Sequence, residues 1–317
     1  MEQRKLIKLG NSSFAIALPK GWIDKSGLKK GDNIFLEENS NGEIIVLPSP
    51  KEKNNKKITL NVENKDFDSI KKEIRATYIR GYDIVKLEGV KEKAVKNDIK
   101  NILNNFLSFE LVEGKDDSLV AKDFFNIEEA SYTNFIRRMD NNIREIFDIS
   151  LEEFRKDKVT PSKLKEVENI DKDVNKFYFL CSRVFLKGID NPSILTSLKM
   201  NGMELFNNWW FAYNLEALSD YIKYFLKNYQ KIEKKEIRDK ILRLFLEIRD
   251  SYLKCMDSFY KEDVSNALQA IEITEKLKND IENLGKTDSI NSDVFNNLYQ
   301  IQKQIYQNAK MMLYVKY

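Results

Sequence analysis

The chain has 317 residues, with 53 Lys and Arg against 50 Asp and Glu, and it contains no histidine. A net charge of +3 excludes a uniformly basic protein, so a site for a polyanion needs a local excess of lysine and arginine. The lack of histidine removes the commonest zinc ligand and the commonest general base. Any metal site would therefore use carboxylates, which suit a divalent ion such as magnesium, calcium or manganese, or iron.

The cysteines and the hydropathy pattern bear on the compartment. Cys181 and Cys255 lie in apolar runs typical of helices, which indicates buried free thiols in a reducing cytosol rather than a disulfide framework. No apolar run is long enough to span a bilayer, and no signal peptide follows Met1. We therefore expect a cytoplasmic protein that is not embedded in a membrane.

Residues 1–50 alternate short strands with tight turns. Apolar residues alternate before Pro19, which predicts a half-buried strand that ends at this proline. A helical turn around Trp22 follows, and Asn41 and Gly42 give a strong hairpin signal between the last two strands. A segment of this size can hardly bury a core alone.

This order of strands and turns resembles the swapped-hairpin DNA-binding domain of the AbrB, SpoVT and MazE-type regulators. The resemblance implies that two copies interleave their hairpins into one small β-rich barrel, and hence a homodimer or higher homo-oligomer with DNA as its partner. Basic residues outnumber acidic ones in the first thirty positions, which suits contacts to phosphates. The alternative is a barrel that serves for dimerisation alone. The candidate DNA-binding residues are Arg4, Lys5, Lys8, Asn11, Ser12, Lys20 and Lys25.

A charged linker and a small α/β domain are predicted next. Residues 51–57 are rich in lysine and asparagine and follow two prolines, which indicates a domain boundary. Strand-like and helix-like segments alternate over residues 58–125, which predicts a small α/β domain of ferredoxin-like type. The stretch from Tyr78 to Asp83 is its most distinctive part, and no catalytic constellation is present. A dimerisation domain, a small-ligand domain and a spacer all stay open.

Residues 128–317 have helical periodicity throughout. Sparse prolines and glycines divide this region into about six helices. The segment that begins at Phe154 resembles the one that begins at Phe259, which indicates two copies of a three-helix unit. The predicted fold class is thus multidomain, with a β-rich barrel, an α/β domain and two three-helix bundles. The six helices are expected near residues 129–157, 162–187, 203–230, 235–260, 263–284 and 291–315.

Acidic residues recur four positions apart along these helices. Residues at this spacing share one helix face, so two carboxylates can reach one cation. Glu216 and Asp220 carry two charges, and Asp171 is followed by Asn175. The corresponding positions of the second three-helix unit carry one negative charge or none, which lowers the expected affinity for a divalent ion there. Glu216, Asp220 and Asp171 are the candidate metal ligands.

A solvated charged face is the alternative for the same acids. Asp220 would then pair with Lys223 on its own helix, and Asp171 would pair with Lys172 or Lys176. Such pairs are common on exposed helices and need no ligand.

The helical region resembles the PhoU family of phosphate-uptake regulators, which have two three-helix bundles and a motif of an acidic residue, three residues and an aspartate. The order of the three parts resembles the archaeal PhoU-like regulators. The resemblance implies a DNA-binding transcription regulator of phosphate homeostasis, whose helices sense phosphate status through a carboxylate-bound ion or a transporter component. The alternative is a signalling adaptor that does not bind DNA and docks on a phosphate transporter or sensor protein. We expect no enzymatic activity, because no histidine, phosphate loop, nucleophile elbow or catalytic cysteine is present. The lowest-ranked alternative is a metal-dependent phosphohydrolase built on Glu216, Asp220 and Asp171.

Overall fold

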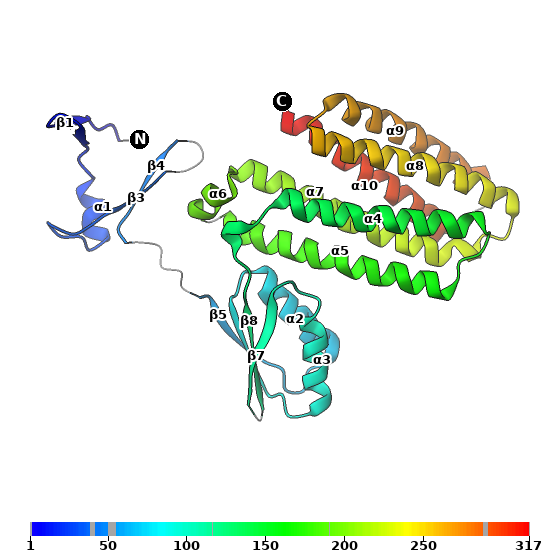
Figure 1. Cartoon of the computed structure of the whole chain (residues 1–317), viewed down its shortest axis with the longest axis horizontal. Helices are drawn as coiled ribbons and strands as arrows, with labels where there is room; N and C mark the ends of the chain where they lie inside the picture. Colours follow the sequence, from blue (N-terminus) through cyan, green and yellow to red (C-terminus); the bar gives the residue numbers. More distant parts are fainter. Residues whose placement is uncertain are drawn as a thin grey trace. The chain divides into compact units, whose positions relative to one another are not determined.

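The computed structural model divides into two compact units, residues 1–54 and 55–317 (Figure 1). It describes residues 2–38, 42–49, 55–115, 117–189, 191–287 and 291–316. Asn41 of the expected hairpin turn and residues 51–54 of the expected linker lie outside the described residues.

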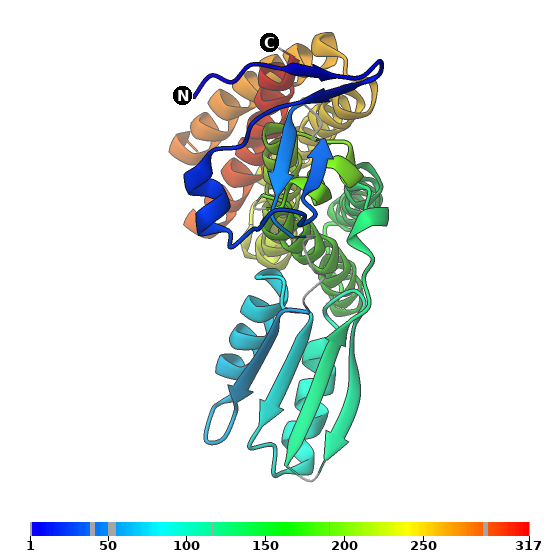
Figure 2. The same ribbon diagram turned by 90° about the vertical axis from the view of Figure 1, so that its left-hand side faces the viewer.

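The first unit consists of two separate hairpins with a short helix between them. Strand β1 (Ile7–Leu9) pairs antiparallel with β2 (Ser13–Ala15), and β3 (Phe35–Glu38) pairs antiparallel with β4 (Ile44–Leu47). Helix α1 (Lys20–Lys25) connects them along the chain, as Figure 2 shows. The β-rich character expected for this segment is confirmed. The two hairpins are separate two-stranded sheets, so a single chain forms no closed barrel among its described residues.

The first unit has no core of its own. No described residue before residue 50 is buried, and Leu6, Leu36 and Ile44 are 68%, 65% and 65% exposed. A two-stranded hairpin is marginal in water without a surface to pack against. Apolar exposure on this scale marks an interaction surface. One copy of the unit therefore lacks the apolar contacts that would hold its hairpins together.

The second unit begins with a four-stranded sheet in the order β5-β6-β8-β7. Strands β5 and β6 are parallel because a helix connects them, whereas β7 and β8 are antiparallel across a tight turn. The chain order is β-α-β-α-β-β rather than the β-α-β-β-α-β of a ferredoxin-like fold, so that part of the prediction is wrong. The elements are β5 (Lys57–Asn61), α2 (Phe67–Ile79), β6 (Ile84–Glu88), α3 (Lys93–Leu103), β7 (Phe109–Lys115) and β8 (Ser118–Asp123).

The helical region contains six long helices that agree with the six expected ones to within a few residues. The short helix α6 was not expected, because Pro192 reads as a breaker but occupies its first turn, after an Asn191 cap. Among the described residues, no helix has the length and hydropathy needed to cross a bilayer. The elements are η1 (Ile127–Glu129), α4 (Tyr132–Arg155), α5 (Pro161–Gly188), α6 (Pro192–Leu198), α7 (Gly202–Asn228), η2 (Tyr229–Lys231), α8 (Lys235–Lys261), α9 (Val264–Thr287) and α10 (Ser292–Lys316).

The long helices form two three-helix groups. Helices α4, α5 and α7 pack together, α8, α9 and α10 pack together, and α7 lies against α10 (Figure 1). Aromatic rings fill the first group, where Phe154 stacks on Tyr229 with ring centroids 4.2 Å apart. Phe154 also meets Phe245 of α8 edge-on at 5.0 Å, so both groups share one apolar core.

A buried arginine on α5 joins the sheet domain to the helical region. Arg183 is 1% exposed, and its Nε and Nη2 donate to Asp123 Oδ2 at 3.0 and 2.5 Å. Its Nη1 donates to the carbonyl of Tyr78 at 2.5 Å, and Nη2 reaches the carbonyl of Tyr82 at 3.1 Å and Asp83 Oδ1 at 3.3 Å. The distinctive stretch from Tyr78 to Asp83 thus supplies three of the hydrogen-bond acceptors of this guanidinium.

Neighbouring contacts strengthen the same junction. Lys187 Nζ donates to Asp83 Oδ1 at 2.5 Å, and the other oxygen of Asp83 accepts from the backbone N–H of Lys56 at 2.8 Å. Gly81 has a φ of +79°, and a Cβ there would lie 2.7 Å from Lys187 Cγ. Phe179 of α5 is part of the apolar core of the sheet domain. The sheet domain is therefore incomplete without α5.

Removal of the guanidinium in Arg183→Met should lower the free energy of unfolding of the second unit by about 3 kcal/mol, because the buried Asp123 loses its cation. Urea titration followed by circular dichroism measures the loss. The exposed Arg138→Met is the matched control and should change stability by less than about 0.5 kcal/mol. Equal stabilities for the two variants would contradict the role given to Arg183.

Candidate functional site

All seven candidate DNA-binding residues are exposed in the first unit. Lys8 lies on β1, Asn11 and Ser12 form the turn that follows, and Lys20 and Lys25 stand at the two ends of α1. Arg4 and Lys5 lie on the segment before β1, and the other five side chains come from the first hairpin and from the helix. These side chains can form one binding surface only if the hairpin and the helix are packed against each other.

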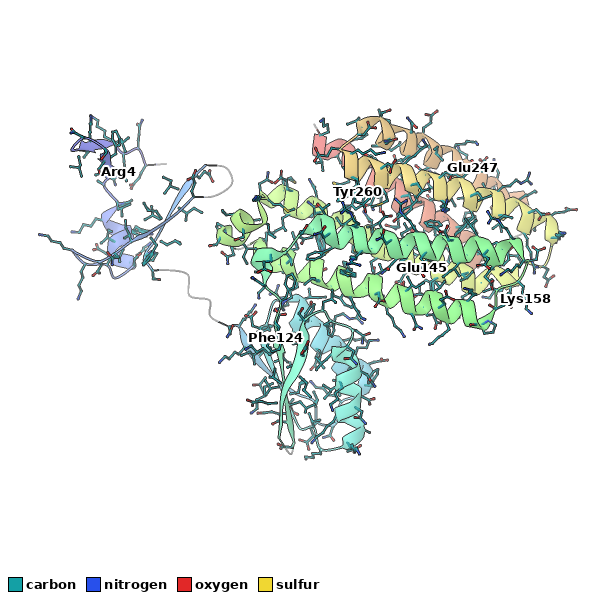
Figure 3. The ribbon with its side chains drawn as sticks, viewed as in Figure 1. Arg4, Phe124, Glu145, Lys158, Glu247 and Tyr260 are labelled. Atoms are coloured by element: carbon teal, nitrogen blue, oxygen red, sulfur yellow. The ribbon has the colours of Figure 1, made fainter. Side chains whose placement is uncertain are left out.

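Most of the candidate basic side chains form no ion pair within the described part of this unit. Arg4, which Figure 3 labels, forms an ion pair with Glu2 at 2.7 Å. Among the described residues, Lys5, Lys8 and Lys20 form no ion pair, and Lys25 forms none either. Unpaired, exposed ammonium groups are the type of group that neutralises phosphates.

The register of the first hairpin places charge and apolar surface together. Lys8 is directly opposite Phe14, so the two side chains point to the same face, while Ile7 faces Ala15 on the other side. Phe14 is 60% exposed. Both faces of the hairpin thus carry apolar side chains. Burial of the face that holds Ile7 and Ala15 would leave Lys8 and Phe14 exposed together on the other face.

The three candidate metal ligands come together between α5 and α7. Asp171 of α5 accepts hydrogen bonds from Ser219 Oγ at 2.7 Å and from Lys223 Nζ at 2.5 Å. Lys223 also donates to Asp220 Oδ1, one turn earlier on α7. Glu216 lies one further turn away and interacts electrostatically with both aspartates. These four ionisable residues are called the acidic cluster below.

Lys223 replaces the partners that the sequence suggested for Asp171. Lys172 donates to Asn169 and Lys176 to Asp173, because these lysines lie on the outer side of α5. Asp171 instead faces α7. The Asp220–Lys223 pair was expected as an exposed pair, but Lys223 is only 17% exposed and bridges two helices.

Burial sets the charge state of the acidic cluster. It raises the pKa of Glu216 to about 7, assisted by the negative charges of Asp220 and Asp171 and opposed by Lys223. Burial also raises the pKa of Asp171, although hydrogen bonds from Lys223 hold the shift back. Burial alone would lower the pKa of Lys223, but its bonds to Asp171 and Asp220 raise it overall. Lys223 therefore stays charged at neutral pH.

The acidic cluster does not fit a metal ion as it stands. The ammonium group of Lys223 lies where a cation shared by Asp171 and Asp220 would have to lie. No group of three or more Asp, Glu or Cys suited to a metal ion occurs in the part of the chain that the structure describes. The metal site stays a prediction that this geometry does not favour.

Buried amides of α10 occupy the positions that the repeat aligns with the acids of α7, Gln304 with Glu216 and Asn308 with Asp220. Asn308 of α10 accepts from Asn214 Nδ2 of α7 at 2.8 Å and donates to the carbonyl of Phe211 at 3.4 Å. Gln302 donates to the carbonyl of Thr274 at 2.6 Å. Asn308 thus joins α10 to α7 of the first group, and Gln302 joins α10 to α9, in both cases through hydrogen bonds of neutral groups.

Residues 7–54 match the family model described as antidote-toxin recognition MazE, bacterial antitoxin. The N-terminal domain is of the MazE type. The match covers a small part of the 317 residues and does not extend into the sheet domain or the helices. No match was found among curated proteins or among solved structures. The PhoU-like character of the helical region is supported by no family match and stays a prediction.

Loss of the bridging cation in Lys223→Met should lower the free energy of unfolding by about 2–3 kcal/mol, because two aspartates lose their partner between α5 and α7. Lys176→Met, which breaks only the ion pair with Asp173, is the control and should cost less than about 1 kcal/mol. Thermal unfolding of the unmodified chain with and without manganese completes the test. A rise in Tm with manganese would support the metal site instead.

The acidic cluster should also make stability depend on pH. The pKa of Glu216 is about 7 in the folded chain against an ordinary 4.5, so the folded state holds the proton more tightly and stability falls as pH rises between these values. Glu216→Gln should remove most of this loss. Between about pH 5 and about pH 8, the variant should lose on the order of 1–2 kcal/mol less free energy of unfolding than the unmodified chain. Urea unfolding at both pH values measures it. Parallel pH profiles for the two proteins would contradict the assignment.

Proposed function

We propose that the chain is a cytoplasmic DNA-binding transcription regulator that acts as a homodimer or a higher homo-oligomer. The observation that carries this proposal is a MazE-type domain whose single copy buries none of its described residues and leaves Lys8, Lys20 and Lys25 without an ion pair among them. Such a domain needs a second copy to acquire a core, and it presents cations for a polyanion.

A second copy accounts for both the apolar and the basic side chains. Interleaved hairpins would bury residues such as Ile7, Leu36 and Ile44 against the partner copy. The two-fold symmetry of a dimer would present each basic residue twice, which matches the symmetry of a duplex with two half-sites. Asn11 and Ser12 at the turn add hydrogen-bonding groups for phosphates or base edges.

The second unit supplies regulation in this proposal. Its sheet domain and helices form one body through Arg183, so a partner bound to the helices acts on the whole unit. We propose phosphate homeostasis as the regulated process and a phosphate transporter component or signalling protein as the partner. The support is the resemblance of two consecutive three-helix groups to the PhoU family. A change in the unit that alters the separation of two DNA-binding domains would alter affinity for DNA.

A signalling adaptor is the second candidate, and the exposed apolar residues of the MazE-type domain favour it equally. In that case the domain serves for dimerisation, and the helices dock on the partner. We propose no enzymatic activity for either form. The two candidates differ in whether the lysines of the first unit contact DNA.

Charge reversal in Lys8→Glu/Lys20→Glu should weaken binding to specific promoter fragments at least about tenfold at moderate salt, because a dimer loses four phosphate-facing cations. The measurement is a titration of sheared genomic DNA with the full chain at two salt concentrations, followed by sequencing of the retained fragments. The salt dependence should become shallower in the variant.

The matched control is Lys72→Glu/Lys100→Glu, which reverses two exposed lysines of the sheet domain and should leave DNA binding unchanged. Sedimentation should show that both variants stay oligomeric. Selective retention of DNA that is equal in all three proteins would mean that other residues contact it. A dimer that retains no fragment selectively would favour the adaptor.

A further inference from the structure

A cavity of about 490 Å³ lies where the ends of α7, α8 and α10 meet α4. Clefts of roughly 300–1,000 Å³ commonly hold small molecules. Thr133 and Phe211 line it from the first three-helix group, and Phe259 and Met311 line it from the second. Figure 3 labels Tyr260, another lining residue, near the end of α8. The cavity therefore belongs to both groups at once.

One part of the lining is apolar and adaptable. Phe211 and Phe259 pack with ring centroids 4.6 Å apart, and Met200, Met311 and Met312 line the same cavity. Methionine side chains adjust to irregular shapes because they are unbranched and polarisable. Such walls accept a hydrocarbon or an aromatic ring.

Another part of the lining is positively charged. Arg137, Lys199 and Lys316 line the cavity, and none of them forms an ion pair among the described residues. Two acids also line it, but Glu204 Oε2 already accepts from the backbone N–H of Asn201 at 2.8 Å in the capping box of α7. Glu262 is exposed at the end of α8. The unpaired cations suit an anionic group.

A hydroxyl without a partner and a fixed tyrosine complete the lining. Ser258 is 1% exposed, and its Oγ has no hydrogen-bond partner, which is costly for a buried polar atom. Tyr260 donates to Asp140 Oδ2 at 2.9 Å, while Tyr252 donates to Asp140 Oδ1 at 2.7 Å. The Arg137 guanidinium lies over the ring of Tyr260, 5.5 Å from its centroid. Asp140 thus fixes the position of the tyrosine ring that the Arg137 guanidinium contacts.

We propose that this cavity binds a small organic anion with an apolar body, such as a carboxylate on a hydrocarbon or aromatic skeleton. The methionines and phenylalanines take the body, Arg137, Lys199 and Lys316 take the charge, and Ser258 gains a hydrogen-bond partner. A molecule held there contacts both three-helix groups and stabilises their packing. This inference does not depend on the DNA-binding proposal.

The test uses anilinonaphthalene sulfonate as a fluorescent probe on the folded full-length chain, with decanoate and decanol as competitors. Decanoate should displace the probe at a concentration at least about tenfold lower than decanol, since a charged hydrogen bond adds about 1.5–3 kcal/mol. Arg137→Gln/Lys199→Gln should weaken decanoate roughly tenfold and leave decanol unchanged. Probe binding that is absent, or equal competition by decanoate and decanol, overturns the proposal.

A second groove provides the matched control. It has a volume of about 460 Å³, lies along α9 and α10, and is also lined by lysines and aromatic rings. Lys278→Gln/Lys303→Gln in this groove should leave competition unchanged. Loss of decanoate binding in this variant, with none in Arg137→Gln/Lys199→Gln, would place the anion there and refute the proposal.

A single substitution tests the proposal even if the Arg137→Gln/Lys199→Gln variant does not fold. Ser258→Ala removes only the buried hydroxyl and should weaken decanoate about threefold to tenfold, while the Tm in the absence of ligand stays equal or rises because an unpartnered polar atom is gone. Unchanged decanoate affinity in both Ser258→Ala and the Arg137→Gln/Lys199→Gln variant would also refute the assignment.

Discussion

The second unit depends on one buried cation. Arg183 is the largest fully buried side chain of the chain's described core, and its guanidinium is surrounded by two backbone carbonyls and two aspartates of the sheet domain. A buried charge is tolerated only when its donors are matched by acceptors. Since those acceptors come from the end of α2, the start of β6 and the end of β8, the arginine fixes the positions of three elements at once.

The buried charges of the acidic cluster are matched by partners in the same way. Lys223 lies between the carboxylates of Asp171 and Asp220, so an ion network joins α5 and α7. In the second three-helix group, an amide hydrogen bond from Gln302 to the carbonyl of Thr274 joins α10 to α9. The two groups therefore share an architecture and differ in electrostatics. In the first group, burial and the nearby Asp220 and Asp171 raise the pKa of Glu216 to about 7, which brings protonation of this carboxyl into the neutral range.

Local patterns predicted the elements well. Apolar periodicity and breakers located six long helices, and the hairpin order pointed to the MazE-type domain. The strand order β5-β6-β8-β7 could not be read in the same way, because it depends on which strand edges meet in the folded sheet. The seven residues of α6 were missed because its proline reads as a breaker.

Local sequence patterns could not predict contacts between residues that are far apart in the chain. Arg183 and Tyr78 are 105 positions apart, and Lys223 and Asp171 are 52 apart. No local rule pairs them, although a single arginine within the apolar run of α5 was a signal that a buried acceptor was needed. The cavity near Tyr260 is equally a product of tertiary packing, because its lining comes from five separate helices and the turns that end them.

The contact between Asp83 and Lys56 has a mechanical consequence. Residue 56 lies directly before β5, at the start of the second unit, and its amide is fastened to the carboxylate that also accepts from Lys187 and Arg183 of α5. A displacement of α5 along its axis therefore pulls on the backbone at residue 56 through one rigid side chain. The first residues of the second unit are therefore held by α5 through the carboxylate of Asp83, as well as by the neighbouring strand of the sheet.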